Sequence, residues 1–306
     1  MLSQGAGLSL LITGGTGFVG QAFVKRLGDQ PVRLATRADS AGWDTVLIGI
    51  TTVVHLAARV HVMHDTAADP LTAFRAVNVE GTLILAREAV AAGVKRFVFV
   101  SSIKVNGEST LRGQPFTADD APAPLDAYGV SKMEAEQCLR ELATQTGMDV
   151  VIIRPPLVYG PGVKANFAAM MRWLKRGVPL PLGAIYNQRS LVALDNLVDL
   201  IVTCLTHPAA ANQTFLVSDG EDVSTTELLR RMGRAMVCPA RLVPVPASWL
   251  NLAATLVGKQ DMAQRLCSSL QVDIAKTRDL LGWRPPLSLD QGLKKAAEGI
   301  GRETVV

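Results

Sequence analysis

The sequence predicts an α/β protein with a doubly wound parallel sheet, joined to a smaller and mostly helical lobe. Three observations support this fold class. Short apolar runs alternate with segments of helical length, a glycine-rich turn follows the first run, and 48% of the 306 residues are apolar against 19% charged. A chain of this composition can cover both faces of a parallel sheet with helices.

Six apolar runs are the predicted strands, because each is short and ends at polar or turn-forming residues. They span residues 8–13, 32–36, 53–57, 97–101, 150–154 and 214–217. Segments of helical length lie between most of them, at 17–27, 71–92 and 131–146. Alternation of strand and helix is typical of a parallel sheet with helices on both faces.

One interval of this pattern is too short. Only fifteen residues separate Arg37 from Val53, whereas each crossover between parallel strands needs ~10 or more residues. The stretch "GWDTVLIG" can supply one short helix but no further strand and crossover. We therefore predict that the usual outer edge strand after Arg37 is missing or vestigial.

The pattern changes at Tyr159, where "PPLVYGPG" and "VPLPLG" indicate loops between short helices, and the last third is mostly helical. We expect a nucleotide-binding core formed by residues 1–158 and about 190–218. A substrate lobe would comprise about 159–189 and 219–306. It would lie over the carboxyl ends of the strands, where open α/β sheets bind their ligands.

Composition excludes several classes of function. The net charge of +4 comes from 31 basic and 27 acidic residues scattered along the chain, which argues against nucleic-acid binding. Four distant cysteines without a Cys-x-x-Cys pair indicate free thiols in a reducing cytoplasm. We expect no metal, because "HVMH" at 61–64 lacks a third ligand nearby. No signal peptide or run of ~18 apolar residues is visible, so we expect a cytoplasmic protein without a transmembrane segment.

The first turn predicts a dinucleotide site of Rossmann type. In "LLITGGTGFVG", Gly14, Gly17 and Gly20 follow a strand and open a helix, so backbone and helix N-terminus can approach a pyrophosphate. The same turn supplies further cofactor-binding candidates, Thr16, Phe18 and Val19. At the end of the second strand stands Arg37 rather than an acid, which favours NADP(H) over NAD(H).

The stretch "YGVSK" predicts the catalytic pair. Tyr128 and Lys132 would lie on one side of a helix, ~6 Å apart along its axis. The lysine charge could lower the tyrosine pKa from ~10 by on the order of three units. Tyr128 could then move a proton at a sugar hydroxyl while hydride passes to or from the nicotinamide, and Lys132 could hold the nicotinamide ribose.

The motifs "TGGTGFVG", "VVHLAAR", "VNVEGT", "FVFVSS", "YGVSK" and "RPPLVYGPG" occur in order over nearly the whole chain. With them the chain resembles the extended short-chain dehydrogenases/reductases of the NAD-dependent epimerase/dehydratase family, in the nucleotide-sugar branch (UDP-glucose 4-epimerase and relatives). The resemblance implies a catalytic triad of Ser102, Tyr128 and Lys132, and a homodimer formed through the helices that begin near residues 71 and 131. Implied cofactor contacts are Leu56, Ala57, Ala58, Asn78, Tyr128, Lys132 and Pro155. Implied substrate contacts are Ser102, Asn166, Arg189 and Arg265.

The two residues after Ser102 reduce the number of reactions that the family resemblance allows. Family members that dehydrate a sugar across C5 and C6 carry an Asp-Glu pair there, whereas this chain has Ile103 and Lys104. Hydride chemistry at C4 of a UDP-activated hexose remains. We favour a 4-keto reductase of an N-acetylated or 6-deoxy hexose for bacterial surface polysaccharide, because Arg37 and the shortened adenine region suit an exchanging cofactor.

Several alternatives remain beside the reductase. The main one is a UDP-glucose or UDP-GlcNAc 4-epimerase, and one from another class is a non-catalytic NAD(P)-binding sensor. The apolar segment "ASWLNLAATLVG" at 247–258 is interpreted as a packed helix, and it also leaves a lipid-diphosphate-linked sugar open. Lys104 is counted as a substrate contact, with a solvent-facing side chain as its alternative.

Overall fold

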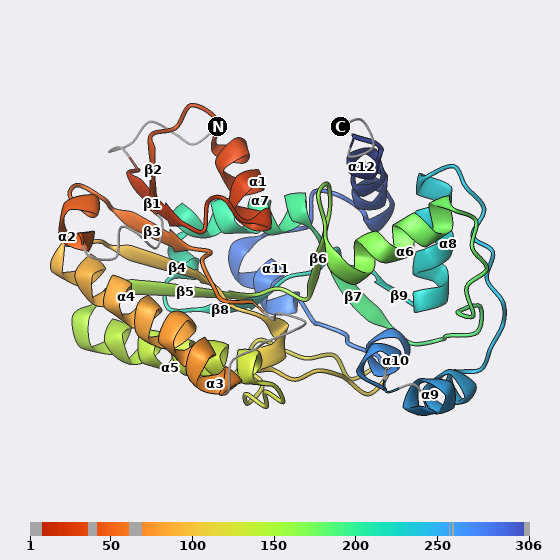
Figure 1. Ribbon diagram of the computed structural model, residues 1–306. Helices are drawn as coiled ribbons and strands as arrows, with labels where there is room; N and C mark the ends of the chain where they lie inside the picture. The colour runs from red at the N-terminus through yellow and green to blue at the C-terminus, as the bar shows by residue number, and fades with distance from the viewer. Residues whose placement is uncertain (1–7, 36–41, 61–68, 257, 259, 303–306) are drawn as a thin grey trace.

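The computed structural model describes residues 8–35, 42–60, 69–256, 258 and 260–302 (Figure 1). Its main element is a six-stranded parallel sheet in the order β2-β1-β3-β4-β5-β8. The strands are β1 (Leu10–Thr13), β2 (Val32–Ala35), β3 (Thr52–His55), β4 (Arg96–Val100), β5 (Asp149–Arg154) and β8 (Thr214–Leu216). Because the order reverses between β1 and β3, the sheet is doubly wound, as predicted, and its ligand crevice is expected at that switch point.

Helices cover both faces of this sheet (Figure 1). Neighbouring strand residues point to opposite faces, so Val54 packs with α1 and α7 while Val53 packs with α4 and α5. Both valines are fully buried, which explains the unbroken apolar runs. The helices on the first face are α1 (Phe18–Leu27), α7 (Leu194–Thr206) and α11 (Ala275–Leu281); those on the second are α2 (Trp43–Val46), α4 (Gly81–Ala91) and α5 (Ala127–Thr146).

The missing edge strand is confirmed for the part of the chain that is described. Strand β2 pairs with β1 alone and lies at the edge of the sheet. Between β2 and β3, the described residues form the single short helix α2. Trp43 of this helix and the following Leu47 are buried against the sheet, where a further strand and crossover would otherwise be expected.

A second, smaller sheet lies beside the carboxyl ends of the first. It consists of β6 (Leu157–Tyr159), β7 (Arg189–Ala193) and β9 (Asp222–Val223) in that order. Helices α6 (Ala165–Lys175), α8 (Thr225–Ala235) and α12 (Leu289–Arg302) pack on it around an apolar cluster of their own. The assignment of 157–159 to a loop was wrong, because a three-residue strand flanked by prolines carries no detectable alternation. Helix α7 and strand β8 return the chain to the main sheet, and the predicted division into core and lobe stays a prediction.

Two helices complete the described chain, α9 (Ala247–Leu256) and α10 (Gln260–Cys267). Helix α9 buries no residue, and its Trp249, Leu252 and Leu256 are largely exposed. The segment forms a helix, as predicted, and packs through the partly buried Ala247 and Leu250, while its other apolar face stays exposed. Among the described residues, no helix is long and apolar enough to cross a bilayer.

Candidate active site

The glycine-rich turn brings the backbone of β1, α1 and β3 into close contact. Gly14 has φ +71°, and a Cβ added there would lie 2.6 Å from the amide nitrogen of Ala57. A Cβ on Gly20 would lie 2.1 Å from the Gly14 carbonyl oxygen. Helix α1 begins at Phe18 without a side-chain cap, so no side chain of the turn competes for its first N–H groups. Only glycine fits this turn, which has the geometry of a pyrophosphate-binding loop.

A cavity of about 600 Å³ opens beside this turn. Leu34, Trp43 and Ile84 form an apolar end, which suits the flat ring of an adenine. The full lining is Thr13, Gly14, Gly15, Thr16, Leu34, Ala35, Trp43, His55, Ala57, Ala76, Val77, Glu80, Gly81, Ile84 and Leu85. The residues present therefore fit a dinucleotide. Arg37 and the "HVMH" stretch lie outside the described residues, and within the described part no cluster of His, Cys, Asp or Glu could hold a metal.

His55 orders the floor of the cavity, a role that sequence reasoning missed. Its Nδ1 lies 2.7 Å from the hydroxyl of Thr13 and its Nε2 lies 3.0 Å from that of Thr82. Burial, aided by the charge of Lys132, lowers the pKa of His55 to about 3, so the ring is neutral. The signal was available, since His55 directly precedes the "LAA" motif at the end of a buried strand. Leu56, Ala57 and Ala58 follow it at the carboxyl edge of the sheet, as the resemblance implies.

Asn78 lies in a helical turn of unusual geometry. The predicted helix 71–92 is divided into α3 (Pro70–Arg75), the π-helical segment Ala76–Glu80 and α4. Such π-turns are frequent at functional sites. The buried Asn78 amide donates to the Arg59 carbonyl (3.0 Å) and to the Ser131 hydroxyl (3.0 Å), and its oxygen accepts from the Arg59 amide (2.8 Å). Ser131 in turn donates to the Tyr128 carbonyl at 2.8 Å. The cofactor loop and the catalytic helix are thereby connected.

Ser102 lies close enough to Tyr128 for a side-chain hydrogen bond to contribute to the pKa of Tyr128. Asp126 caps the helix of Tyr128, accepting from the Gly129 amide at 2.7 Å. This N-cap, five residues before the predicted start at 131, is a missed helix signal. Burial and the Asp126 charge raise the pKa of Tyr128 to about 12, against the lowering effect of the Ser102 bond. Tyr128 therefore stays protonated in the unliganded protein.

Lys132 is the fully buried member of the predicted triad. Its ammonium donates to the Val100 carbonyl at 2.8 Å and lies 3.9 Å from the centre of the Phe99 ring. Burial lowers its pKa to about 7, against the raising effect of Glu136. We expected Lys132 to lower the pKa of Tyr128, whereas burial and the Asp126 charge raise this pKa. The ammonium is directed to Val100 and loses much of its charge to desolvation.

The positions that carry acids in dehydratases are filled differently here. Ile103 is buried, and its amide donates to the Pro155 carbonyl at 3.0 Å, which ties the serine loop to the end of β5. The Lys104 ammonium is ion-paired with Glu108 (2.9 Å) and with Asp126. From the sequence, Lys104 was expected to contact the substrate or to face solvent. Neither expectation included these two ion pairs.

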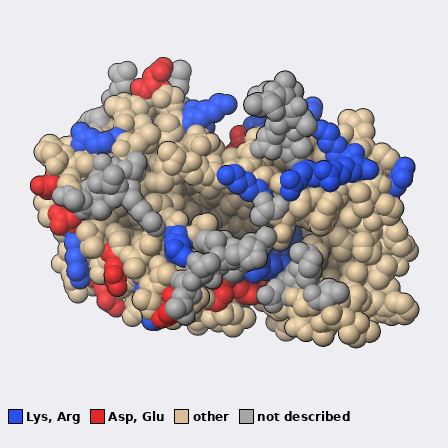
Figure 2. Space-filling view, in the orientation of Figure 1, with Lys and Arg blue, Asp and Glu red and all other residues tan. Residues whose placement is uncertain are grey.

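Arg189 and Arg265, two of the five predicted substrate residues, are neighbours. Arg189 begins β7, and its Nη1 donates to the Arg265 carbonyl at 2.8 Å and the Ser268 carbonyl at 3.1 Å, at the end of α10. The Arg265 side chain is exposed, as is Asn166 in the first turn of α6. Figure 2 shows a hollow between the half that carries the main sheet and the half that carries α6 and α8, with basic side chains at its rim. This setting suits an anionic ligand.

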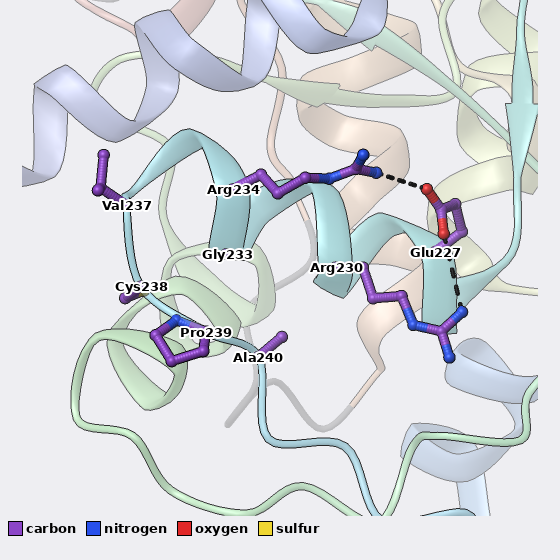
Figure 3. Close-up of a pocket in the computed structure, with 8 residues that line it drawn as sticks. All are labelled: Glu227, Arg230, Gly233, Arg234, Val237, Cys238, Pro239 and Ala240. Atoms are coloured by element: carbon purple, nitrogen blue, oxygen red, sulfur yellow. Dashed lines mark hydrogen bonds and ion pairs between the residues drawn. The ribbon is translucent and has the colours of Figure 1, made fainter.

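A second cavity, of about 670 Å³, lies along α8 and the segment after it (Figure 3). Its basic residues face Glu227, which pairs with Arg234 at 2.7 Å and with Arg230 at 3.8 Å. It contains none of the predicted site residues, and its cations are engaged by an acid of the same helix. We therefore assign the active site to the crevice of the main sheet.

The comparisons with solved structures concern the fold of the protein. UDP-glucose 4-epimerase from Thermotoga maritima with UDP-glucose superimposes with a TM-score of 0.78 at 22% identity, covering 97% of this chain and 100% of that one. MoeE5 in complex with UDP-glucuronic acid and NAD gives 0.77 at 23% identity, covering 96% and 99%. At these identities the likeness concerns the fold alone, and both structures share it over nearly the whole chain.

The sequence comparisons then give the family. The profile described as "NAD dependent epimerase/dehydratase family" matches residues 10–218. A protein of Vibrio cholerae described as UDP-glucose 4-epimerase is 51% identical over 310 residues, covering 95% of this chain and 94% of that one. The chain belongs to the NAD-dependent epimerase/dehydratase family, and it is an enzyme of its nucleotide-sugar branch. The resemblance drawn from the motifs is confirmed.

Proposed function

We propose that the protein is a UDP-hexose 4-epimerase that retains NAD through its catalytic cycle. The observation that carries this proposal is the 51% identity to the Vibrio cholerae UDP-glucose 4-epimerase over 95% of the chain. It favours the alternative reading of the sequence over the 4-keto reductase. The inference of NADP(H) rested on Arg37, which lies outside the described residues, so NAD is proposed here together with the epimerase.

The geometry supports proton transfer at a sugar hydroxyl. When bound, the nicotinamide accepts hydride from C4 and returns it, and its positive charge favours ionisation of a nearby phenol. Tyr128 would take the proton of the C4 hydroxyl as hydride leaves and give it back after the sugar has turned over. Ser102 would hold the same oxygen, and Lys132 the ribose. The Asp-Glu pair that would eliminate water is not present in this chain. Its two positions are occupied by Ile103, which is buried, and by Lys104, which is ion-paired.

Fewer contacts support the proposed binding site for the substrate than support the catalytic residues. Arg189 and Arg265 would bind the diphosphate, because arginines can donate paired hydrogen bonds to phosphate oxygens, and Asn166 would contact the same ligand. Another relative, from Escherichia coli O157:H7, is described as an N-acetylglucosaminyl-diphospho-undecaprenol 4-epimerase and is 26% identical over 95% of this chain and 94% of that one. With the exposed apolar face of α9, it makes a lipid-diphosphate-linked sugar a second candidate substrate.

The assembly is proposed from the family alone. Helices α4 and α5 pack on each other along one side of the main sheet. A homodimer would pair these two helices with their copies. Sedimentation or light scattering of the purified protein distinguishes a dimer from a monomer directly.

The deciding experiment incubates the purified protein with UDP-glucose and UDP-GlcNAc without added cofactor. Formation of the C4 epimer under these conditions, with NAD released on denaturation, supports the proposal. In a second arm the protein receives UDP-4-keto-6-deoxy-HexNAc with NADPH, where stoichiometric oxidation of NADPH with no epimerisation in the first arm would establish the reductase instead. A third arm supplies an undecaprenyl-diphosphate-linked GlcNAc.

Tyr128→Phe is the matched catalytic control for every arm. It removes the hydroxyl and keeps the ring against Phe74, whose centre lies 6.0 Å away. We expect a loss of turnover of at least ~10²-fold, the usual contribution of a positioned acid–base group. The cofactor content after purification should remain that of the wild type. Normal turnover in this variant would remove Tyr128 from the mechanism.

A further inference from the structure

Lys104 occupies a junction between two catalytic elements. It follows Ser102 in the short 3₁₀-helix Ile103–Val105, and its ammonium reaches across to Asp126, the N-cap of the helix that bears Tyr128. The same ammonium is 2.9 Å from Glu108. The side chains of Lys104 and Asp126 are 26% and 27% exposed, so water screens this ion pair only in part. The two segments also touch through their backbones, since a Cβ on Gly129 would lie 2.9 Å from the Lys104 carbonyl.

Asp126 has two effects on Tyr128 that oppose each other. One carboxylate oxygen caps the helix by accepting from the Gly129 amide, which fixes the first turn and so the tyrosine. Its negative charge, however, disfavours the phenolate that Tyr128 must become during catalysis. A positive charge on the other carboxylate oxygen keeps the cap and offsets the charge. Lys104 supplies that positive charge.

The remaining charged groups near Tyr128 are engaged elsewhere or lie on the outer side of the helices. Lys132 is bonded to the Val100 carbonyl, and Glu136 is paired with Arg154 inside the core. Glu134 is paired with Arg75 of α3. The ring of Phe74 packs edge-on against Tyr128 and carries the Arg59 guanidinium 5.5 Å from its centre. The charged or titratable groups on the elements around Tyr128 are thus Lys104, Glu108 and Asp126 near Ser102 and the helix N-terminus, Lys132, Glu134 and Glu136 on the helix itself, Arg59 and Arg75 near Phe74, and the neutral His55 of β3.

We propose that Lys104 is a positioning residue for Tyr128, which clamps the serine loop to the helix N-terminus and neutralises Asp126 so that Tyr128 can ionise near neutral pH. It acts through Asp126 and touches neither sugar nor cofactor. The inference rests on the proposed function, because it takes Tyr128 as the group that moves the proton at C4. It replaces the earlier expectation that Lys104 contacts the substrate.

Four variants, built from three substitutions, distinguish the effect of the Lys104 and Asp126 charges from the effect of side-chain shape. Lys104→Met keeps the aliphatic length of the side chain and removes the charge. Asp126→Asn removes the opposite charge and keeps an oxygen that can cap the helix, since Asn and Asp are comparable N-caps. The double variant Lys104→Met/Asp126→Asn has neither charge. Lys104→Arg restores the positive charge with a different head group.

The readout is the pH dependence of kcat for C4 epimerisation by the holoenzyme. In Lys104→Met the uncompensated Asp126 charge raises the pKa of Tyr128, so the acidic limb moves to higher pH by about half a unit to one unit. In Asp126→Asn the limb moves to lower pH. The double variant returns close to the wild type, and Lys104→Arg stays close to it throughout. KM for the UDP-sugar changes less than about twofold in Lys104→Met, as for a side chain with no substrate contact.

Each other outcome overturns the inference. A rise in KM with an unmoved acidic limb would make Lys104 a substrate contact. A lower Tm with unmoved limb and unmoved KM would make it a structural residue only. If the wild type instead reduces a 4-keto sugar, the proposed epimerase fails, but Tyr128 then acts as the acid. The alkaline limb of that reaction should shift upward in Lys104→Met, so the two failures are distinguishable.

Discussion

Lys132 places an amine in a fully buried position, and the unliganded protein is destabilised by it. Its pKa of about 7 lies below the ordinary 10.5, so between these values the unfolded chain binds a proton that the folded chain does not. Stability must then rise with pH across this window. We predict that Lys132→Met abolishes turnover, yet raises the free energy of unfolding at pH 7 by roughly 1 to 3 kcal/mol, because a buried charge is replaced by an apolar chain.

Urea denaturation of the cofactor-free protein at pH 7 and pH 9 measures this effect. The wild type should gain stability between the two values, and Lys132→Met should gain clearly less. The control is Lys295→Met, which removes a lysine from an exposed ion pair with Asp195 and should leave stability nearly unchanged. A destabilised Lys132→Met at pH 7 would mean that the Val100 bond and the Phe99 contact outweigh desolvation.

Gly20 shows how tightly the cofactor turn is packed. A Cβ at this position would lie 2.1 Å from the Gly14 carbonyl oxygen, and backbone can yield only by moving the whole turn. We predict that Gly20→Ala costs roughly 1 to 3 kcal/mol of stability and removes cofactor copurification. Gly42→Ala is the control, because its Cβ would meet no atom nearer than 3.7 Å. Thermal melts and the absorbance of bound cofactor check both, and unchanged cofactor content in Gly20→Ala would contradict the assignment of the turn.

At the scale of secondary structure, most of the main sheet could be predicted. All six strands were located. The absence of the usual edge strand from the described residues was also predicted, because fifteen residues cannot contain two crossovers. The catalytic roles of Ser102 and Tyr128 stay predictions, which rest on the motifs "FVFVSS" and "YGVSK". The ion pair between Lys104 and Asp126 could not be found, since it joins residues 22 apart through tertiary structure. Two strands of the second sheet, β6 and β9, have only three and two residues, which are too few for a periodic signal.

A buried ion pair connects the catalytic helix to the sheet. Arg154 ends β5 and donates both to Glu136 of α5 (2.6 Å) and to Asn106 (2.9 Å), and the ion-paired side chains are 2% and 1% exposed. Removing one member of such a pair leaves an uncompensated buried charge. We predict that Arg154→Met destabilises the protein by about 3 to 5 kcal/mol in urea denaturation. Lys132, one turn before Glu136, would be displaced with it.

The double variant keeps this prediction testable if the single one does not fold. Arg154→Met/Glu136→Leu removes both charges and should recover most of the lost stability. Arg75→Met is the matched control, because it breaks an ion pair of the same helix with Glu134 whose members are 45% and 25% exposed. A loss in Arg154→Met no larger than in Arg75→Met would show that the buried pair is not essential to the fold.

At the scale of the whole molecule, the C-terminal segment packs into the hydrophobic core of the main sheet. Leu281 and Trp283 belong to the same buried cluster as Leu10 of β1 and Phe23 of α1. Trp283 donates to Asp199 of α7 at 3.0 Å, and the Leu287 amide donates to Asn196 at 2.8 Å. The segment around Trp283 and, through Val192, strand β7 therefore share the hydrophobic core of the main sheet. This packing predicts that the predicted core and lobe unfold together.

The four tryptophans allow this prediction to be tested. Trp43 lies beside the cofactor cavity and Trp283 in the C-terminal segment, and both are buried, whereas Trp173 and Trp249 are 40% and 72% exposed. In a background of Trp173→Phe and Trp249→Phe, a further Trp43→Phe or Trp283→Phe leaves one reporter. For each single-tryptophan protein, urea unfolding is followed by tryptophan fluorescence and by circular dichroism, which reports the loss of helix. We expect the two transitions to coincide in both proteins. If Trp283 were released before Trp43, the C-terminal lobe would be an independent folding unit, and substrate binding could then reorder it without disturbing the cofactor site.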